Sequence, residues 1–248
     1  MRKLITITAI LLFSTAKLWA SSPLVDTVKQ PLSIISDSLK GPIFTHIAAG
    51  YMRYDTVKTK KKRQEYQDKA LDFTMQALHY YSKYNDTTGM RSSFYNLAKV
   101  YHAQRKYTQA KWFILQADNF SRAKNDVPNL INSLLELAAI KSDIKDYDLA
   151  MRDLNEALVL SVNNHYSHNE SAVQESFAIL YTRTQNYDKA AAALKRHNII
   201  DDSIRKSEEA ALIAKAKTSD SLQNKKKVFS SNSKKLSKNV SSKKTASL

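Results

Sequence analysis

One short segment of the sequence gathers side chains that could ligate a metal ion. It contains His165, His168 and Glu170. Two imidazoles three residues apart and a carboxylate could chelate Zn²⁺, but structural zinc sites in proteins have four ligands and a fourth is missing here. Ser167 and Glu170 also have the spacing of a helix capping box. We therefore interpret the segment as a polar turn between helices and predict no metal site.

Other catalytic chemistry has no support in the sequence. A calcium site could be suggested by three nearby acids, Asp143, Asp146 and Asp148, but the segment lacks the glycine and the distal glutamate of an EF-hand calcium-binding loop. The chain has only three glycines, scattered singly, so it contains neither a phosphate-binding loop nor a serine elbow. It has no cysteine, which excludes thiol catalysis, disulfides and cysteine-ligated metals. We predict a protein that is not an enzyme and needs no cofactor.

A repeat of 40 residues sets the elements that would position any binding side chain. Tyrosine and alanine recur together at this spacing, as Tyr107 and Ala110, Tyr147 and Ala150, and Tyr187 and Ala190. Within one unit the apolar residues have helical spacing, with Phe94, Leu97, Ala98 and Tyr101 on one face and Tyr107, Ala110, Ile114 and Ala117 on another. Each unit is therefore predicted to be a pair of amphipathic helices.

This pattern resembles that of tetratricopeptide repeat (TPR) proteins, whose usual period is about 34 residues. The first clear repeat carries a suitable residue at all eight positions of the family pattern. The second has Lys141 in place of the aromatic residue, and the third has Gln174 and His197 at two positions. The resemblance implies an all-α fold, a right-handed superhelical solenoid of antiparallel helix pairs. The extra residues imply helices longer than usual.

The repeat domain is predicted to span residues 43–224, after a linker at 21–42. Its repeats cover about 43–84, 88–126, 127–164 and 168–200, the first of them degenerate and with a basic connection at 55–62. An end helix over 199–224 would cover the open end of the stack, which otherwise leaves an apolar face in water. The passage from Asn198 to Ile204 resembles the exit segment of bacterial TPR sensor modules, but no membrane-length apolar run and no output domain follow it.

The two ends of the sequence have their own patterns. Residues 1–20 combine Arg2 and Lys3, an apolar run over residues 4–13 and Ala20, in the order typical of a secretory signal peptide. We expect cleavage within a few residues of Ala20 and an exported protein, periplasmic or extracellular. Residues 225–248 hold eight lysines and seven serines. They are predicted to form a disordered tail.

The net charge of +16 comes from 39 basic and 23 acidic residues, and much of the excess lies in the tail and in one short segment. That segment contains Lys58, Lys60, Lys61, Lys62 and Arg63. These two regions could be a solvated surface, could contact an anionic envelope or lipid surface, or could bind nucleic acid. Few aromatic residues are interleaved with the lysines, and export removes the chain from the genome, so the sequence argues against nucleic acid.

The resemblance also implies where a partner would bind. In TPR proteins the first helix of each pair lines a concave groove, and the corresponding residues here are Tyr95, Lys99, His102, Leu135, Ala139, Glu175, Ile179 and Arg183. Tyr95 and Lys99 replace the lysine and asparagine of the carboxylate-clamp version of the fold. The mixed lining favours a peptide or protein segment. We predict an exported scaffold that binds a protein or peptide in this groove; the alternative is a protein that binds polyanions or membrane surfaces through residues 58–63 and the tail.

Overall fold

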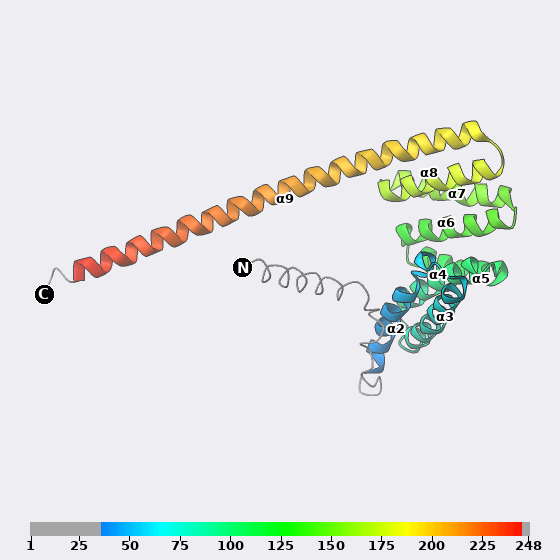
Figure 1. Cartoon of the computed structure of the whole chain (residues 1–248), viewed down its shortest axis with the longest axis horizontal. Helices are drawn as coiled ribbons and strands as arrows, with labels where there is room; N and C mark the ends of the chain where they lie inside the picture. Colours follow the sequence, from blue (N-terminus) through cyan, green and yellow to red (C-terminus); the bar gives the residue numbers. More distant parts are fainter. Residues whose placement is uncertain (1–35, 245–248) are drawn as a thin grey trace, which may run out of the picture. The chain divides into compact units, whose positions relative to one another are not determined.

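The protein is helical throughout the part of the chain that the structure describes. This computed structural model describes the backbone of residues 36–244 and the side chains of residues 36–216. In chain order the elements are α2 (Asp37–Tyr51), the 3₁₀ turn η1 (Tyr54–Thr56), α3 (Lys60–Lys83), α4 (Thr87–Ala103), α5 (Tyr107–Ala123), α6 (Val127–Asp143), α7 (Tyr147–Asn163), α8 (Ser167–Arg183) and α9 (Tyr187–Lys244) (Figure 1). The predicted all-α fold is confirmed. The predicted signal peptide at 1–20 lies outside the described residues.

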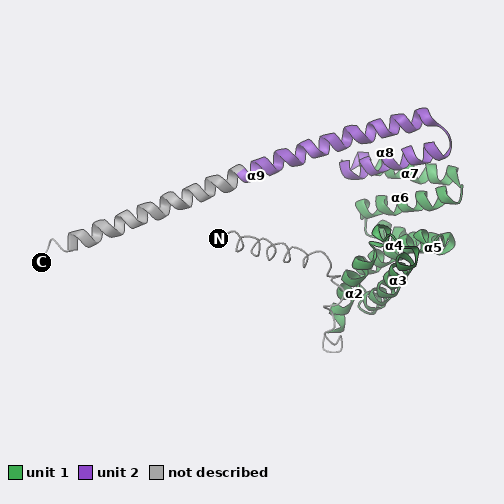
Figure 2. Ribbon diagram, in the orientation of Figure 1, with its two compact units in different colours: residues 1–161 green, residues 162–248 purple. Residues whose placement is uncertain are grey.

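The chain divides into two compact units, residues 1–161 and residues 162–248 (Figure 2). In the first unit, α2 packs along α3 and α4 along α5, while the α3–α4 and α5–α6 contacts join one pair to the next. α4 is the first helix of its pair, and it also touches α2 and α6, the first helices of the pairs before and after it. These three helices are therefore neighbours in one layer. In the second unit, α8 packs along α9. Each helix buries its apolar stripe against the other helix of its pair and, in the first unit, against the next pair.

Each junction between helices from α3 to α9 uses the same tight turn. One residue per turn adopts a left-handed conformation, with φ between 52° and 65°, and these residues recur every 20 positions: Asn85, Arg105, Asn125, Lys145, His165 and Gln185. After α4, the backbone N–H of Arg105 donates to the carbonyl of His102 at 2.8 Å, and that of Lys106 donates to Tyr101 at 2.9 Å. This pair of bonds is the Schellman motif that ends a helix. The regular turn fixes the predicted period of 40 residues.

Capping side chains begin several of the helices. Asp86 accepts a hydrogen bond from the backbone N–H of Gly89 at 2.9 Å, and Asp126 accepts one from Asn129 at 3.3 Å. Asn186 accepts a longer one from Lys189, at 3.4 Å. The predicted capping box at Ser167 is wrong, because α8 begins at Ser167 itself and the capping position belongs to the preceding tyrosine.

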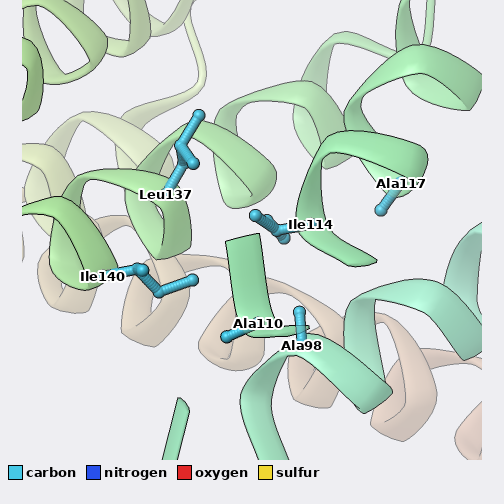
Figure 3. Packing of buried hydrophobic residues seen from close by; sticks show 6 residues of the cluster. All are labelled: Ala98, Ala110, Ile114, Ala117, Leu137 and Ile140. Carbon is cyan, nitrogen blue, oxygen red and sulfur yellow. The ribbon is translucent and has the colours of Figure 1, made fainter. Parts of the chain in front are cut away.

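Small side chains hold the middle helices together. A core cluster joins three helices of the first unit through Ala98 of α4, Ala110, Ile114 and Ala117 of α5, and Leu137 and Ile140 of α6 (Figure 3). None of these side chains is more than 5% exposed. The alanines let the helix axes approach closely, because a larger side chain would push them apart. The alanines and Ile114 occupy the positions that the repeat pattern predicts to be buried.

A tyrosine of α3 packs against one glycine of α2 and one glycine of α4. A methyl group at Gly41 of α2 or at Gly89 of α4 would lie 2.8 Å or 2.2 Å from the ring of Tyr81 of α3. The Tyr81 hydroxyl also lies 3.0 Å from the hydroxyl of Thr45. The absent side chains at the two glycines therefore make room for the ring of Tyr81.

The N-terminal boundaries differ from those predicted. α2 begins at Asp37, six residues before Ile43, so part of the predicted linker 21–42 is helical and Pro42 lies inside the helix. Asp37 makes ion pairs with Lys40 at 2.6 Å and with Lys83 of α3 at 2.7 Å, which fix this first turn. Lys40 and Lys83 hold the pKa of Asp37 at about 2 through these hydrogen bonds. The basic connection is also shorter than predicted, because α3 begins at Lys60.

The C-terminal part of the chain differs more. The sequence predicts a separate end helix at 199–224 and a disordered segment at 225–248, but α9 is one helix from Tyr187 to Lys244. The sequence from 187 onward contains neither glycine nor proline, so no strong helix-breaking residue interrupts it. Lysine and alanine are good helix formers. The described part of the second unit therefore contains no separate helix after α9 that could cover this last pair.

Candidate functional site

Five of the predicted binding residues lie on two neighbouring helices of the first unit. Tyr95, Lys99 and His102 follow one another at intervals of four and three residues on α4, and Leu135 and Ala139 are one turn apart on α6. The side chains of Lys99 and Ala139 are exposed, and those of Tyr95, His102 and Leu135 are half-buried. We call the surface formed by these residues, with Glu136 and Asp143 of α6, the α4–α6 face.

His102 connects the two helices of this face. Its Nδ1 atom lies 2.7 Å from Oε1 of Glu136, and its Nε2 atom lies 2.9 Å from Oδ2 of Asp143. Both ring nitrogens can donate only when the imidazole is doubly protonated. Burial opposes this charged form, but the hydrogen bonds to the two carboxylates outweigh burial and raise the pKa of His102. His102 is therefore an imidazolium clamp between α4 and α6.

Tyr95 is partly a packing residue. Its ring packs against the core cluster of α4, α5 and α6, and the ammonium of Lys99 lies 5.9 Å from its centre. Burial, with a smaller contribution from the charge of Glu136, raises the pKa of the Tyr95 hydroxyl to about 12. Tyr95 therefore stays neutral at physiological pH and offers an aromatic edge and a hydroxyl group, while Lys99 supplies the accessible positive charge.

The other flank of α4 is fixed by the 3₁₀ turn. Tyr54 of η1 is 3% exposed, and its hydroxyl donates a hydrogen bond of 3.4 Å to the backbone carbonyl of Lys99. Burial raises the pKa of Tyr54, with a further contribution from the charge of Asp55. α4 is thus held by Tyr54 on one side and by the bonds of His102 to α6 on the other. The face is a stiff platform with exposed side chains on it.

The comparisons with known proteins agree with this architecture. No protein-family model matches the chain, and no curated protein matches it. Solved structures do resemble it. BtubC (BKLC) from P. vanneervenii shares 18% identity at a TM-score of 0.56, over 82% of this chain and 74% of that one. The apo form of RapI shares 16% identity at a TM-score of 0.59, over 73% of this chain and 62% of that one.

A third similar structure is built of TPR-like repeats. It is a Podosopora anserina putative kinesin light chain with nearly identical TPR-like repeats, with 16% identity and a TM-score of 0.53 over 67% of this chain and 76% of that one. This chain has a TPR-like solenoid fold. The predicted resemblance to TPR proteins is confirmed at the level of the fold.

Three further predicted residues lie in the second unit of the TPR-like fold, on α8. Glu175 and Arg183 are exposed, and Ile179 is 51% exposed. Their helix is neighbour to α9 within this unit. They form a separate surface on the second unit.

Sequence reasoning missed Glu136 and Asp143. Both carboxylates contact His102, yet neither stands at a position that the TPR pattern marks as ligand-facing. Asp143 drew attention only as a possible calcium ligand, whereas in the structure it accepts a hydrogen bond from the imidazole. The sequence does contain a usable signal. A histidine near the end of the first helix of one pair can meet two acids on the first helix of the next pair when these two helices are neighbours.

The other candidate clusters are ordinary parts of the TPR-like helices. His168 lies 3.4 Å from Glu208, and Glu170 accepts a hydrogen bond of 2.8 Å from Arg196, so both side chains face α9. Among the described residues, no group of three or more acidic or histidine side chains is placed to hold a metal ion. Within the same residues, none of the helices is long and apolar enough to cross a membrane.

The predicted basic segment begins just before α3 and fills its first turn. Its side chains are exposed: Lys58, Lys60, Lys61, Lys62 and Arg63. Arg63 donates to the backbone carbonyl of Val57 at 3.1 Å, and the ammonium of Lys62 lies 5.8 Å from the ring centre of Tyr66. Positive charges at a helix N-terminus oppose the helix dipole, so this turn gains from any anion that neutralises it.

Proposed function

We propose that this TPR-like protein is an exported, non-enzymatic scaffold that holds a peptide segment or a partner protein against the α4–α6 face. One observation carries the proposal. On both helices, exposed residues alternate with residues that pack into the core: Lys99 and Ala139 are exposed, whereas Leu97 and Leu137 are at most 5% exposed. The buried residues fix the helices, and the exposed ones remain available for contact.

The chemistry of the face favours a peptide with mixed character. Lys99 offers an accessible positive charge, Tyr95 and Leu135 offer half-buried apolar surface, and Ala139 leaves room beside them. A short side chain at this point allows a partner backbone to come close. An extended or helical segment with an acidic residue next to apolar ones would complement this set.

Export is part of the proposal and rests on the sequence. The positive residues Arg2 and Lys3, the apolar run at 4–13 and the small residue Ala20 have the order of a signal peptide. The partner would then be a component of the cell envelope or the medium. Detection of the intact N-terminus on cytosolic protein, by mass spectrometry after cell fractionation, would contradict export.

A second candidate function is favoured by the exposed basic turn. Five positive side chains cluster in six residues, from Lys58 to Arg63, at the start of α3. Such a cluster attracts anionic lipid or other polyanions through charge alone. Binding of this kind weakens strongly as salt rises, whereas contact with apolar groups on the α4–α6 face does not.

The test is site-specific photo-crosslinking in envelope extracts. A photoreactive residue at Ala139 should capture a defined partner, and the same residue at the exposed Ala191 of α9 should not. The double variant Lys99→Glu with Ala139→Arg should abolish capture of that partner in a pull-down. Its matched control, Lys195→Glu with Ala191→Arg, places the same changes on exposed positions of α9 and should leave capture unchanged.

The salt dependence separates the two candidates. Capture that persists between about 50 and 200 mM salt and disappears only with the face variant supports the scaffold. If all capture disappears on removing residues 225–248 or on replacing Lys60, Lys61 and Lys62 by Gln, and the face variant has no effect, the scaffold proposal is wrong and the polyanion candidate is supported.

A further inference from the structure

The first unit contains a cavity that is separate from the α4–α6 face. It has a volume of about 320 Å³ and lies among α5, α6 and α7. Four leucines contributed by these three helices form its apolar wall. α5 contributes Lys111, Leu115, Asp118 and Arg122, which are spaced by four, three and four residues and so form one stripe along the helix. A cavity of this size accommodates a small organic molecule.

One end of the cavity is negatively charged. The Nε of Arg122 donates to Oδ2 of Asp118 at 2.8 Å, and its Nη2 donates to Oε1 of Glu156 on α7 at 2.8 Å. Hydrogen bonding to Asp118, with a further one to Glu156, raises the pKa of Arg122 despite partial burial. Two carboxylates share one guanidinium here, so these three groups together carry a charge of minus one.

The remaining oxygen of Asp118 has no partner among the described groups. Asp118 is 7% exposed, and its Oδ1 atom is buried without a hydrogen bond. A buried carboxylate oxygen needs a donor, because burial removes the water that would otherwise solvate it. Asp118 belongs to the cavity lining, so a turn of its carboxylate would bring this oxygen to a ligand that supplies the donor.

The rest of the lining limits the ligand further. Lys141 and Asp153 pair with each other at 2.5 Å and are 4% and 3% exposed, so their charges are already matched. Lys111 lies two turns before Asp118 on α5, and Arg152 lies one turn before Glu156 on α7. Arg152 approaches Asp153 only to 3.9 Å. The cavity lining therefore also carries the positive charges of Lys111 and Arg152.

We propose that this cavity binds a primary ammonium group carried on an unbranched apolar stem. The ammonium donates a hydrogen bond to Oδ1 of Asp118 and neutralises the surplus negative charge beside Arg122. The stem contacts the leucine wall. Lys111 and Arg152 repel a second positive charge, so the far end of the ligand is uncharged or anionic. The site is independent of partner binding on the α4–α6 face, since none of its residues belongs to that face.

The test is an NMR titration of the full mature chain with n-pentylamine. Pentylamine should shift the amide signals of residues 115–122. Pentan-1-ol lacks the ammonium group, and 1,5-diaminopentane adds a second one, so each should bind at least tenfold more weakly. Nα-acetyl-lysine methylamide distinguishes the source: if it binds as well as pentylamine, the site takes a lysine side chain, and if it does not, the site takes a free amine.

Three variants make the result decisive. Asp118→Asn keeps the shape of the side chain and should weaken pentylamine binding at least tenfold, whereas Asp148→Asn, an exposed acid of α7 outside the cavity lining, should not. Leu115→Trp fills the cavity from its partly exposed rim and should abolish binding while the melting temperature stays near that of the parent. Absence of pentylamine binding, equal binding of pentanol, or unchanged binding by folded Asp118→Asn protein would overturn the proposal.

Discussion

The α4/α5 pair and the α8/α9 pair share one sequence pattern but bury it differently. Ile114 of α5 and Leu194 of α9 occupy the same position of the 40-residue repeat, yet Ile114 is fully buried and Leu194 is 48% exposed. α5 packs against α4 on one side and α6 on the other, whereas within its unit α9 packs against α8. Burial of a repeat position is therefore decided by the next helix pair as much as by the residue itself.

The last pair compensates with polar contacts. His197 stands where the first clear repeat has Ala117, and its Nδ1 atom lies 2.8 Å from the hydroxyl of Ser171 on α8. The same hydroxyl contacts Asp201, and Arg196 pairs with Glu170 at 2.8 Å. A fully covered alanine in the middle of the chain thus corresponds to a half-buried histidine held by hydrogen bonds in the last pair. At this repeat position, apolar packing in the middle of the chain is therefore replaced by polar contacts in the last pair.

The largest effect is expected from Lys141, which occupies the position that is aromatic in Tyr101 and Tyr181. Its ammonium pairs with Asp153, and both side chains are at most 5% exposed. Lys141→Met should lower the free energy of unfolding by about 3–5 kcal/mol, because it removes the ammonium that pairs with the buried carboxylate of Asp153. Adding Asp153→Leu should restore most of the loss. Denaturant unfolding measures both. An equally large loss in the double variant would show that packing, and not charge, is the cause.

The next largest effect on the free energy of unfolding comes from a pair of variants that compares the two regions directly. Ile114→Ala removes a fully buried side chain and should cost about 2–5 kcal/mol. Leu194→Ala removes a side chain that is 48% exposed and should cost less than about 1 kcal/mol. Denaturant unfolding of the two variants tests the difference. Equal losses would mean that the outer surface of the last pair is covered in solution.

His102 should give a smaller effect that depends on pH. Its pKa is raised in the folded protein, so its contribution is complete below the unfolded pKa of about 6.5 and is lost as pH rises through the folded pKa. Replacing His102 by Gln should cost about 1.5–3 kcal/mol at pH 5.5 and clearly less at pH 9. The control is His168→Gln, since the side chain of His168 is 74% exposed. A cost for His102→Gln that is the same at both pH values would contradict the imidazolium clamp.

The smallest predicted effect is a gain. Lys145 has a φ of 65°, which strains any residue with a Cβ atom. Lys145→Gly should therefore raise the free energy of unfolding by about 1 kcal/mol. Lys145→Ala keeps the Cβ atom and should give no gain. Thermal unfolding of the three proteins compares them, and a loss of stability in the glycine variant would mean that the lysine side chain has a role in the turn.

The middle of the chain could be predicted from sequence because its pattern is local. Tyr107, Ala110, Ile114 and Ala117 repeat at helical spacing, and the same residues then pack against the neighbouring helices. The period of 40 follows from tight turns that need no glycine, so the scarcity of glycine did not hide it.

The features that sequence did not reveal depend on neighbours far along the chain. The exposure of Leu194 depends on which helices cover it. The hydrogen bonds of His102 to α6 depend on α4 and α6, the first helices of two successive pairs, lying next to each other. The length of α9 departs from the prediction for another reason: a high content of serine and lysine suggests disorder, whereas the lack of any helix-breaking residue allows one long helix. The buried Lys141 was recognised as a departure from the TPR pattern, but its partner Asp153 was not.

Hydrogen exchange of the backbone amides in the full chain tests the central claim most directly, namely that α5 is covered on both sides whereas α9, within the described part of the second unit, is covered by α8. The amides of residues 113–120 in α5 should exchange slowest, with protection near that of global unfolding. Those of residues 201–216 in α9, whose side chains are exposed apart from the partly buried Ile204, should exchange orders of magnitude faster. Equal protection of the two segments would contradict the account, because it would require a further contact that covers α9.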